Sequence, residues 1–426
     1  MRSGNEHAQR REFAQAEQLY RRALALEPAS VPARKNLATV LWFQDRKAEA
    51  EREFGAVMKQ APRDPVPHLY VGLAAHSRKQ FAAAALHFQQ AGPLALDNPE
   101  VLPAVLEAFL ATRDTAVPQR LLAQLESAGS PDPELALRVA ALFVQYGRPD
   151  AAVTALEKLV SSGEAGAEVW PALAHAYDQA GRPQAAYGAY NRVLANDPRS
   201  EQAYLDLARF AAAHQNRPFA MEVIEKGLRN LPGSAKLLLE QGLLMAMEGD
   251  RARAEAAFAK AAQADSHSNL PLLAAGVLLL ESGEVERAAE RFRGAARIDP
   301  RDFRAEYLYA TALGRMPNQD AARASQTAAA LRRAIALNPK DANCRAALGK
   351  AYLSMKRNAE GIRELEQALK LDPGNLTALY QLGLAYQAQG SAERAQPLLQ
   401  KFRELKGKAR EEETAPVQIM RIVRGQ

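Results

Sequence analysis

The chain has 426 residues, 48% hydrophobic and 6% aromatic, and its 55 Lys and Arg against 49 Asp and Glu leave a formal net charge of +6. No apolar run reaches the roughly 18 residues of a membrane-spanning helix, since the run at 270–280 is too short. One cysteine, Cys344, excludes a disulfide scaffold or a cysteine-based zinc cluster, and we expect it to be a buried, reduced thiol. The small charge excess on so long a chain indicates no particular partner.

A spacing of 34 residues recurs along the chain. Prolines lie 34 residues apart at Pro28 and Pro62, Pro198 and Pro232, and Pro339 and Pro373. Similar turn sequences end at Ser30, Asp64, Ser200, Ser234, Asp302, Asp341 and Asn375. A period of this length is typical of helix–turn–helix repeats.

Small residues recur between these turns, where two helices must approach closely. One set is expected in the first helix of each unit and comprises Gly72, Gly242, Gly276, Gly349 and Gly383. A facing set is expected in the second helix and comprises Ala50, Ala84, Ala152, Ala254, Ala288 and Ala395. Phe54, Phe88, Phe258 and Phe292 are predicted to fill the space between consecutive repeats. Larger residues at the small positions would hold the helices apart, at a cost of about 1–3 kcal/mol.

The unit at 167–198 carries the complete pattern: Trp170, Leu173, Ala174, Tyr177, Gly181, Ala186, Tyr190, Val193 and Pro198. This pattern resembles the tetratricopeptide repeat (TPR). The resemblance implies an all-α fold, an α-solenoid wound as a right-handed superhelix of about twelve tandem helix–turn–helix units. It covers nearly all of the chain, and the first unit is truncated.

The units follow one another in chain order, with departures from the frame at four places. Residues 1–96 hold units one to three, of which the first has lost the opening turn of its first helix. Either the chain is a piece of a longer one, or another surface covers this end, which allows end-to-end association. Residues 97–132 form a degenerate unit with Pro118 inside its expected second helix, and a bend or a boundary between sub-arrays is our hypothesis there.

Residues 133–302 hold units five to nine, and residues 303–341 hold a unit with an insertion at 316–321 that we expect to form a longer loop. Residues 342–407 hold units eleven and twelve. Residues 408–426 are expected to form a polar C-terminal cap and an apolar tail beyond Pro416.

In the TPR family, certain positions of each first helix face a concave groove. Mapped onto this chain, the candidate peptide-binding residues are Lys35, Asn36, Trp42, Phe43, Tyr70, Arg138, His175, Asp178, Arg209, Tyr307, Lys350 and Tyr380. The same mapping adds Thr39, Glu240 and Arg315. Trp42, Phe43 and Tyr70 form its most aromatic stretch, and they either anchor a peptide or pack between neighbouring repeats.

Two specialised recognition modes of the family do not carry over. The chaperone-type carboxylate clamp matches at Lys35, but Thr39 and Tyr70 occupy its next positions. The asparagine ladder of the sugar-transferase TPR domain matches at Asn36 and not in the units that follow.

Two further groups of residues could form a functional site, but each is also explained as ordinary solvent-exposed surface. His175 and Asp178 lie one helical turn apart and could ligate a metal or shuttle a proton, but no third ligand is visible, and we interpret them as a solvated pair. A run of arginines comprises Arg287, Arg291, Arg293, Arg297, Arg301 and Arg304. It could meet phosphates, but acidic residues dilute it, so a solvated surface is our interpretation.

We therefore predict a non-enzymatic scaffold or adaptor that binds protein or peptide segments, with no cofactor and no metal. One alternative is a docking or regulatory region of a larger enzyme or secretion complex. A weaker one is a nucleic-acid binder that uses the arginine run. No signal peptide is visible, so the default location is cytoplasmic, and an exported location stays open if the N-terminus is truncated.

Overall fold

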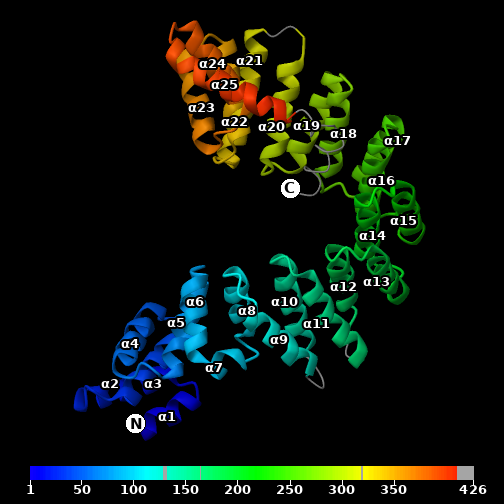
Figure 1. Ribbon diagram of the computed structural model, residues 1–426. Helices are drawn as coiled ribbons and strands as arrows, with labels where there is room; N and C mark the ends of the chain where they lie inside the picture. The colour runs from blue at the N-terminus through cyan, green and yellow to red at the C-terminus, as the bar shows by residue number, and fades with distance from the viewer. Residues whose placement is uncertain (128–131, 164, 318–319, 410–426) are drawn as a thin grey trace. The chain divides into compact units, whose positions relative to one another are not determined.

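The computed structural model describes residues 1–127, 132–163, 165–317 and 320–409, and every regular element in them is an α-helix (Figure 1). None of these helices has both the length and the apolarity needed to span a bilayer. The chain divides into two units, Met1–Asp197 and Pro198–Gln426.

The first unit contains α1 (Arg2–Gln9), α2 (Phe13–Leu26), α3 (Val31–Phe43), α4 (Lys47–Gln60), α5 (Pro65–Ser77), α6 (Phe81–Ala91), α7 (Pro93–Leu96), α8 (Leu102–Ala111), α9 (Ala116–Ser127), α10 (Pro133–Gln145), α11 (Pro149–Ser162), α12 (Val169–Gln179) and α13 (Pro183–Asn196). The second unit contains α14 (Glu201–Ala213), α15 (Arg217–Asn230), α16 (Ala235–Met247), α17 (Arg251–Ala264), α18 (Leu270–Glu281), α19 (Val285–Ile298), α20 (Phe303–Arg315), α21 (Ala321–Leu337), α22 (Ala342–Ser354), α23 (Asn358–Leu371), α24 (Leu376–Ala388) and α25 (Ala392–Ala409).

Apart from the short α7, these helices alternate between the first and the second helix of a pair. The first helices are α1, α3, α5, α8 and the even-numbered helices from α10 to α24. Within each unit, a helix packs mainly on its partner and on the next pair along the chain. Serial packing of this kind is the α-solenoid that the sequence predicted.

The recurring turns are the N-terminal caps of the first helices. The side chain of Asp64 accepts a hydrogen bond from the backbone N–H of Val66, two residues further on. Capping bonds of the same kind are made by Ser200, Ser234, Asp302, Asp341 and Asn375. A cap satisfies an N–H group that has no acceptor inside the helix, which explains why the turns resemble one another.

The turn between the two helices of a pair has a left-handed residue. Gly181 and Gly249 adopt φ values of 69° and 83° there, a conformation that glycine takes up without strain at the end of a helix. Asp45 and Lys356 hold the same position with φ of 59°. The turn is therefore kept even where a side chain makes this backbone conformation less favourable.

The predicted small-residue crossings are confirmed by the contacts of their glycines. A Cβ atom added to Gly242 would lie 2.5 Å from Phe258 Cε1 and 3.1 Å from the backbone oxygen of Ala254. A Cβ atom on Gly276 would likewise lie 2.5 Å from Phe292 Cε1. The second helix approaches so closely that only glycine leaves room for the phenylalanine ring.

The degenerate unit at 97–132 follows the additional helix α7. Pro118 is the third residue of α9, in the first turn, where an N–H group has no intrahelical acceptor. A proline is tolerated there because its missing N–H costs no hydrogen bond. The predicted bend or boundary at 97–132 stays a prediction, and the two units of the structure meet at Asp197 and Pro198.

The predicted loop insertion at 316–321 is partly helical. Ala321 begins α21, which has 17 residues, whereas α19 has 14. The insertion is therefore accompanied by a longer second helix. At the end of the chain, α25 continues through Gly407, and the predicted apolar tail lies outside the described residues.

Candidate functional site

An aromatic cluster joins the first three helical pairs, and we define it as Phe13, Trp42, Phe43, Phe54 and Tyr70. Tyr70 is at its centre, stacked on Phe54 with ring centroids 5.0 Å apart and an interplanar angle of 7°. The ring centroid of Trp42 lies 5.2 Å from that of Tyr70, and the ring of Phe43 meets the Tyr70 ring edge-on with centroids 6.4 Å apart. The sequence-predicted residues Trp42, Phe43 and Tyr70 are thus brought together.

These three aromatic residues differ in how much of each is available to a ligand. Trp42 and Tyr70 are partly buried against the core of the first pairs, and burial raises the pKa of the Tyr70 hydroxyl. Phe43 is 57% exposed, although its ring stacks on Phe13 at 5.6 Å. Trp42 and Tyr70 are therefore packed between neighbouring repeats, and Phe43 offers the accessible ring of the aromatic cluster.

The polar residues predicted beside this cluster are engaged with their neighbours. Lys35 Nζ lies 2.7 Å from Asp64 Oδ2, so this lysine joins α3 to the cap of α5. Asn36 donates a hydrogen bond of 2.9 Å to Asn5 Oδ1, which also accepts one from the hydroxyl of Tyr20. These side chains connect successive pairs and are not poised for a ligand.

The predicted groove residues in the middle of the chain lie on four successive first helices, α10, α12, α14 and α16. Arg138 and His175 are exposed, and Asp178 is half-buried. In the described part of the chain, no group of three or more His, Cys, Asp or Glu side chains is placed to hold a metal ion. Arg209 Nε donates to Glu240 Oε2 at 3.2 Å, and Glu240 is only 2% exposed. This pair links α14 to α16.

Tyr380 is the last predicted groove residue along the chain. It is 40% exposed, and its ring lies 4.9 Å from that of Phe402 in α25. The ring therefore packs on the second helix of its own pair.

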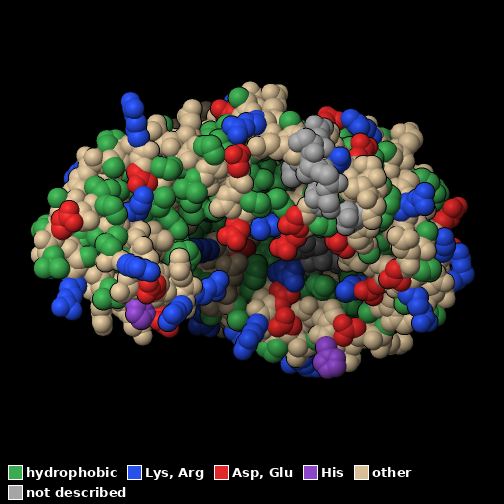
Figure 2. Space-filling view, turned by 90° about the horizontal axis from the view of Figure 1, so that it is seen from below, with side chains coloured by type: hydrophobic (Ala, Val, Ile, Leu, Met, Phe, Trp, Pro, Cys, Tyr) green, Lys and Arg blue, Asp and Glu red, His purple; other side chains and the backbone are tan. Residues whose placement is uncertain are grey.

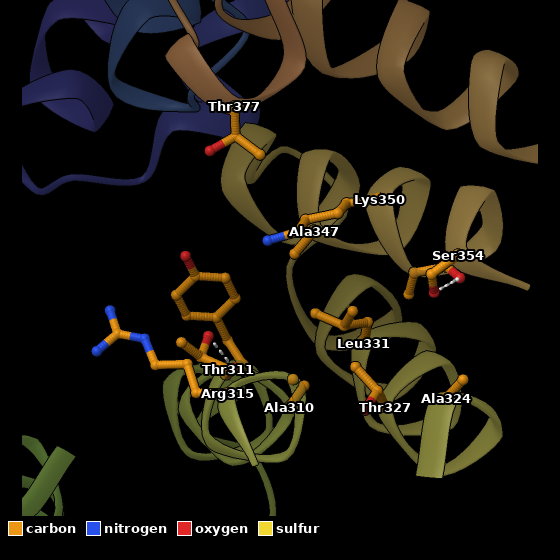
Figure 3. Close-up of a pocket in the computed structure, with 13 residues that line it drawn as sticks. Ala310, Thr311, Arg315, Ala324, Thr327, Leu331, Ala347, Lys350, Ser354 and Thr377 are labelled. Atoms are coloured by element: carbon orange, nitrogen blue, oxygen red, sulfur yellow. Dashed lines mark hydrogen bonds between the residues drawn. The ribbon is translucent and has the colours of Figure 1, made fainter. Parts of the chain in front are cut away.

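A pocket of about 410 Å³ opens in the second unit between α20, α21 and α22 (Figure 3). It is lined by Tyr307, Ala310, Thr311, Gly314, Arg315, Ala324, Thr327, Leu331, Ala347, Lys350, Ala351, Ser354 and Thr377. Tyr307 and Lys350, predicted from the sequence as separate groove residues, line the same cavity. Thr311, Thr327, Ser354 and Thr377 also line it, although sequence reasoning did not select them.

Two cationic side chains stand at this pocket. Lys350 reaches from α22 toward the side formed by α20, where Thr311 and Arg315 lie (Figure 3). The nearest carboxylate to Arg315 is that of Glu281, 3.7 Å from Nη1, and both side chains are substantially exposed. Among the described residues, no carboxylate lies within ion-pair distance of Lys350. Arg315 therefore has a counter-ion in Glu281, whereas the charge of Lys350 is not compensated by any described carboxylate.

Three hydroxyl groups of the pocket donate to their own helices. Thr311 donates to the backbone oxygen of Tyr307 at 2.9 Å, and Ser354 donates to that of Ala351 at 2.7 Å. Thr327 donates in the same way to the oxygen of Arg323. Because these three protons are engaged, the oxygens of Thr311, Thr327 and Ser354 act as acceptors, and Lys350 and Arg315 are the cationic donors of the pocket.

The pocket forms where the repeat pattern changes. Phe54, Phe258 and Phe292 are each the seventh residue from the end of their second helices, and each is fully buried. In α21 the same position holds Leu331, which is smaller than phenylalanine. Leu331 lines the pocket. Leucine at this position is not in itself a signal for a pocket, because Leu156 in α11 and Leu365 in α23 hold the same place and are fully buried.

Comparisons with known proteins identify the repeat. Family models described as tetratricopeptide repeat match residues 7–69 and 167–210, and one described as TPR repeat matches residues 351–390. No curated protein matches the chain.

Among solved structures, the chain is similar to MamA at 28% identity, over 39% of this chain and 95% of that one, with a TM-score of 0.35. Yeast Tom70 is 15% identical over 99% of this chain and 94% of its own, with a TM-score of 0.44. YrrB, described as a TPR protein with an unusual peptide-binding site, is 21% identical over 44% of this chain and 95% of its own, with a TM-score of 0.36. Because all three TM-scores lie below 0.5, nothing about the function of this chain follows from these likenesses.

Proposed function

We propose that this chain, which belongs to the tetratricopeptide repeat family, is a non-catalytic scaffold that binds an acidic segment of a partner protein. The family assignment supports protein–protein interaction in general terms. The binding position and the chemistry of the partner are our proposal. It places the segment over the first helices α20, α22 and α24, with one acidic side chain in the pocket at Lys350.

The single observation that carries this proposal is the composition of that pocket. Its floor is apolar, from Ala310, Leu331 and Ala347, and its donors are the cations Lys350 and Arg315. An aspartate or glutamate side chain matches both parts, because its methylene groups fit the floor and its carboxylate meets the cations. A cavity of about 410 Å³ is large enough to enclose such a side chain and part of its backbone.

A preformed pocket on packed helices also lowers the cost of binding. Lys350 and Tyr307 project from helices that pack against a common core of Ala310, Leu331 and Leu348. Because this framework does not have to order when the partner arrives, more of the contact free energy appears as affinity.

The test is selection from a library of short random peptides, followed by measurement of the affinity of the selected peptides for the full chain. We expect enrichment of aspartate and glutamate. Lys350→Gln should weaken binding about tenfold or more, the effect of losing one charge-assisted hydrogen bond. Lys340→Gln is the matched control, because Lys340 is exposed and lies outside the pocket.

A second variant blocks the pocket without changing its charge. Leu331→Phe restores the ring found in other second helices and fills the space beside Ala310, so it should abolish binding while circular dichroism stays unchanged. Peptides without acidic residues that bind equally well to both pocket variants and to the unmodified chain would contradict the proposal.

A further inference from the structure

A second hollow of the second unit, about 380 Å³, lies between α19, α20 and α21. Its polar lining consists of Arg293, Arg297, Glu306, Tyr309, Gln326 and Arg333. We call it the arginine hollow. It shares no lining residue with the pocket at Lys350, although both use α20 and α21.

The one carboxylate of the arginine hollow is already engaged. Arg333 donates through Nε and Nη2 to the two oxygens of Glu306, at 2.8 and 2.9 Å. This two-point pair raises the pKa of the Arg333 guanidinium, and the Glu306 side chain is only 17% exposed. The carboxylate of Glu306 thus neutralises Arg333, and it has no ion pair with Arg293 or Arg297 among the described contacts.

The four arginines of α19 fall into two groups. Arg287 pairs with Glu284 and Glu255, and Arg291 lies 3.7 Å from Glu255. In contrast, no carboxylate of the described chain lies within ion-pair distance of Arg293 or Arg297. The two α19 arginines without a counter-ion in the described part of the chain are the two that line the arginine hollow.

Arg293 and Arg297 also repel each other. They are four residues apart on α19, so their guanidinium groups are neighbours on one face of the helix. Like charges at this spacing are unfavourable, and an anion bound between them would relieve the repulsion while forming hydrogen bonds with both.

A phosphate monoester fits this arrangement better than a carboxylate does. It carries between about 1.5 and 2 negative charges and has three acceptor oxygens. The hollow presents two uncompensated guanidinium groups, and Tyr309 and Gln326 add a hydroxyl and an amide. Planar guanidinium groups bind phosphate at two points, which lysine cannot do.

The make-up of the hollow favours a single phosphorylated side chain over a nucleic acid. On the one face of the molecule that Figure 2 draws, basic and acidic side chains are interspersed. A nucleic acid requires a continuous basic track, usually with several aromatic rings for stacking, whereas this hollow includes one tyrosine. We propose that the arginine hollow binds a phosphorylated side chain of a partner protein.

The experiment uses the full chain and a library of short peptides that contain phosphoserine between random flanking residues. We expect peptides to be enriched that lose their affinity when the phosphate is removed. Arg297→Gln and Arg293→Gln should each weaken these peptides about tenfold or more. Arg301→Gln, an exposed arginine outside the hollow, and Lys350→Gln, in the other pocket, should leave the affinity unchanged.

Four results would overturn the proposal. They are failure to enrich any phosphopeptide, equal binding of the unphosphorylated forms, insensitivity to both arginine variants, and inorganic phosphate binding as tightly as the peptides. Binding of an oligonucleotide that is stronger than that of the peptides, and weakened equally by Arg301→Gln, would indicate a nucleic-acid surface instead. Lys350→Gln affects only the proposed binding of acidic peptides at the other pocket. A failure of the phosphopeptide proposal can therefore be told apart from a failure of the proposed function.

Discussion

Replacing Gly242 by alanine tests the close packing on which the helical pairs depend. The added Cβ atom would lie 2.5 Å from Phe258 Cε1 and 2.6 Å from Phe258 Cδ1, closer than carbon atoms approach without displacement. Phe258 is 1% exposed, so its ring has no open space to enter. The backbone oxygen of Ala254, 3.1 Å from the new atom, limits movement of α17 as well.

The magnitude follows from two opposing contributions. Alanine stabilises a helix by about 0.8–1 kcal/mol relative to glycine, whereas overpacking a filled core costs about 1–3 kcal/mol. Gly188→Ala in α13 isolates the first contribution, because a Cβ atom there meets nothing within 4 Å. The difference between the two variants should therefore be about 1–3 kcal/mol, and Gly242→Ala should lower local stability while Gly188→Ala raises it.

Hydrogen exchange read by mass spectrometry is the suitable assay, because long repeat arrays do not unfold in one cooperative step. We expect the amides of α16 and α17 to exchange faster in Gly242→Ala, and those of α13 to exchange more slowly in Gly188→Ala. If α16 and α17 became more protected in Gly242→Ala, the close approach of these helices would be refuted.

Three further perturbations probe other parts of the fold. Cys344 is fully buried, and burial raises the pKa of its thiol, so a thiol reagent at pH 8 should label it only after the chain unfolds. His68 Nδ1 lies 3.0 Å from His87 Nδ1, and burial lowers the pKa of His87 from 6.5. Because the folded-state pKa is lowered, the stability of the folded chain is lost as the pH falls below about 6.5. In His87→Gln the melting temperature should fall less steeply between pH 7 and pH 5. Tyr70→Ala should destabilise the first unit by about 2–4 kcal/mol, whereas Phe43→Ala, at an exposed ring, should cost less than about 1 kcal/mol in urea unfolding.

The repeat was predictable because its determinants are local. The spacing of Pro28 and Pro62 gives the period, and Asp64 caps the helix that follows the turn. Gly242 and Phe258 are 16 residues apart and meet within one helical pair, so the sequence itself indicates which side chains touch. Each inference needed only the geometry of two neighbouring helices.

The sites were less predictable because they depend on whether a polar residue already has a partner. Lys35 and Lys350 occupy first-helix positions that are both suited to a groove, yet Lys35 pairs with Asp64, 29 residues away, whereas Lys350 has no such carboxylate among the described residues. The same distinction separates Arg287 from Arg293 on α19. Comparing one position at a time with a repeat pattern does not reveal an ion pair to a residue about one repeat away. Whether the two side chains meet depends on their conformations.

Both proposed sites adjoin the pair α20–α21, and the irregularity of this pair accounts for the first of them. In the pairs α3–α4, α16–α17 and α18–α19 a buried phenylalanine fills the space between helices, whereas the pair with Leu331 and the lengthened α21 has a cavity beside Lys350. The arginine hollow does not depend on Leu331, because Gln326 and Arg333 face it from other positions of the same helix. Leu331→Phe should therefore abolish binding of acidic peptides and leave phosphopeptide binding at Arg293 and Arg297 intact. Loss of both activities in this variant would mean that the pair had been distorted as a whole, and the two sites would then not be independent.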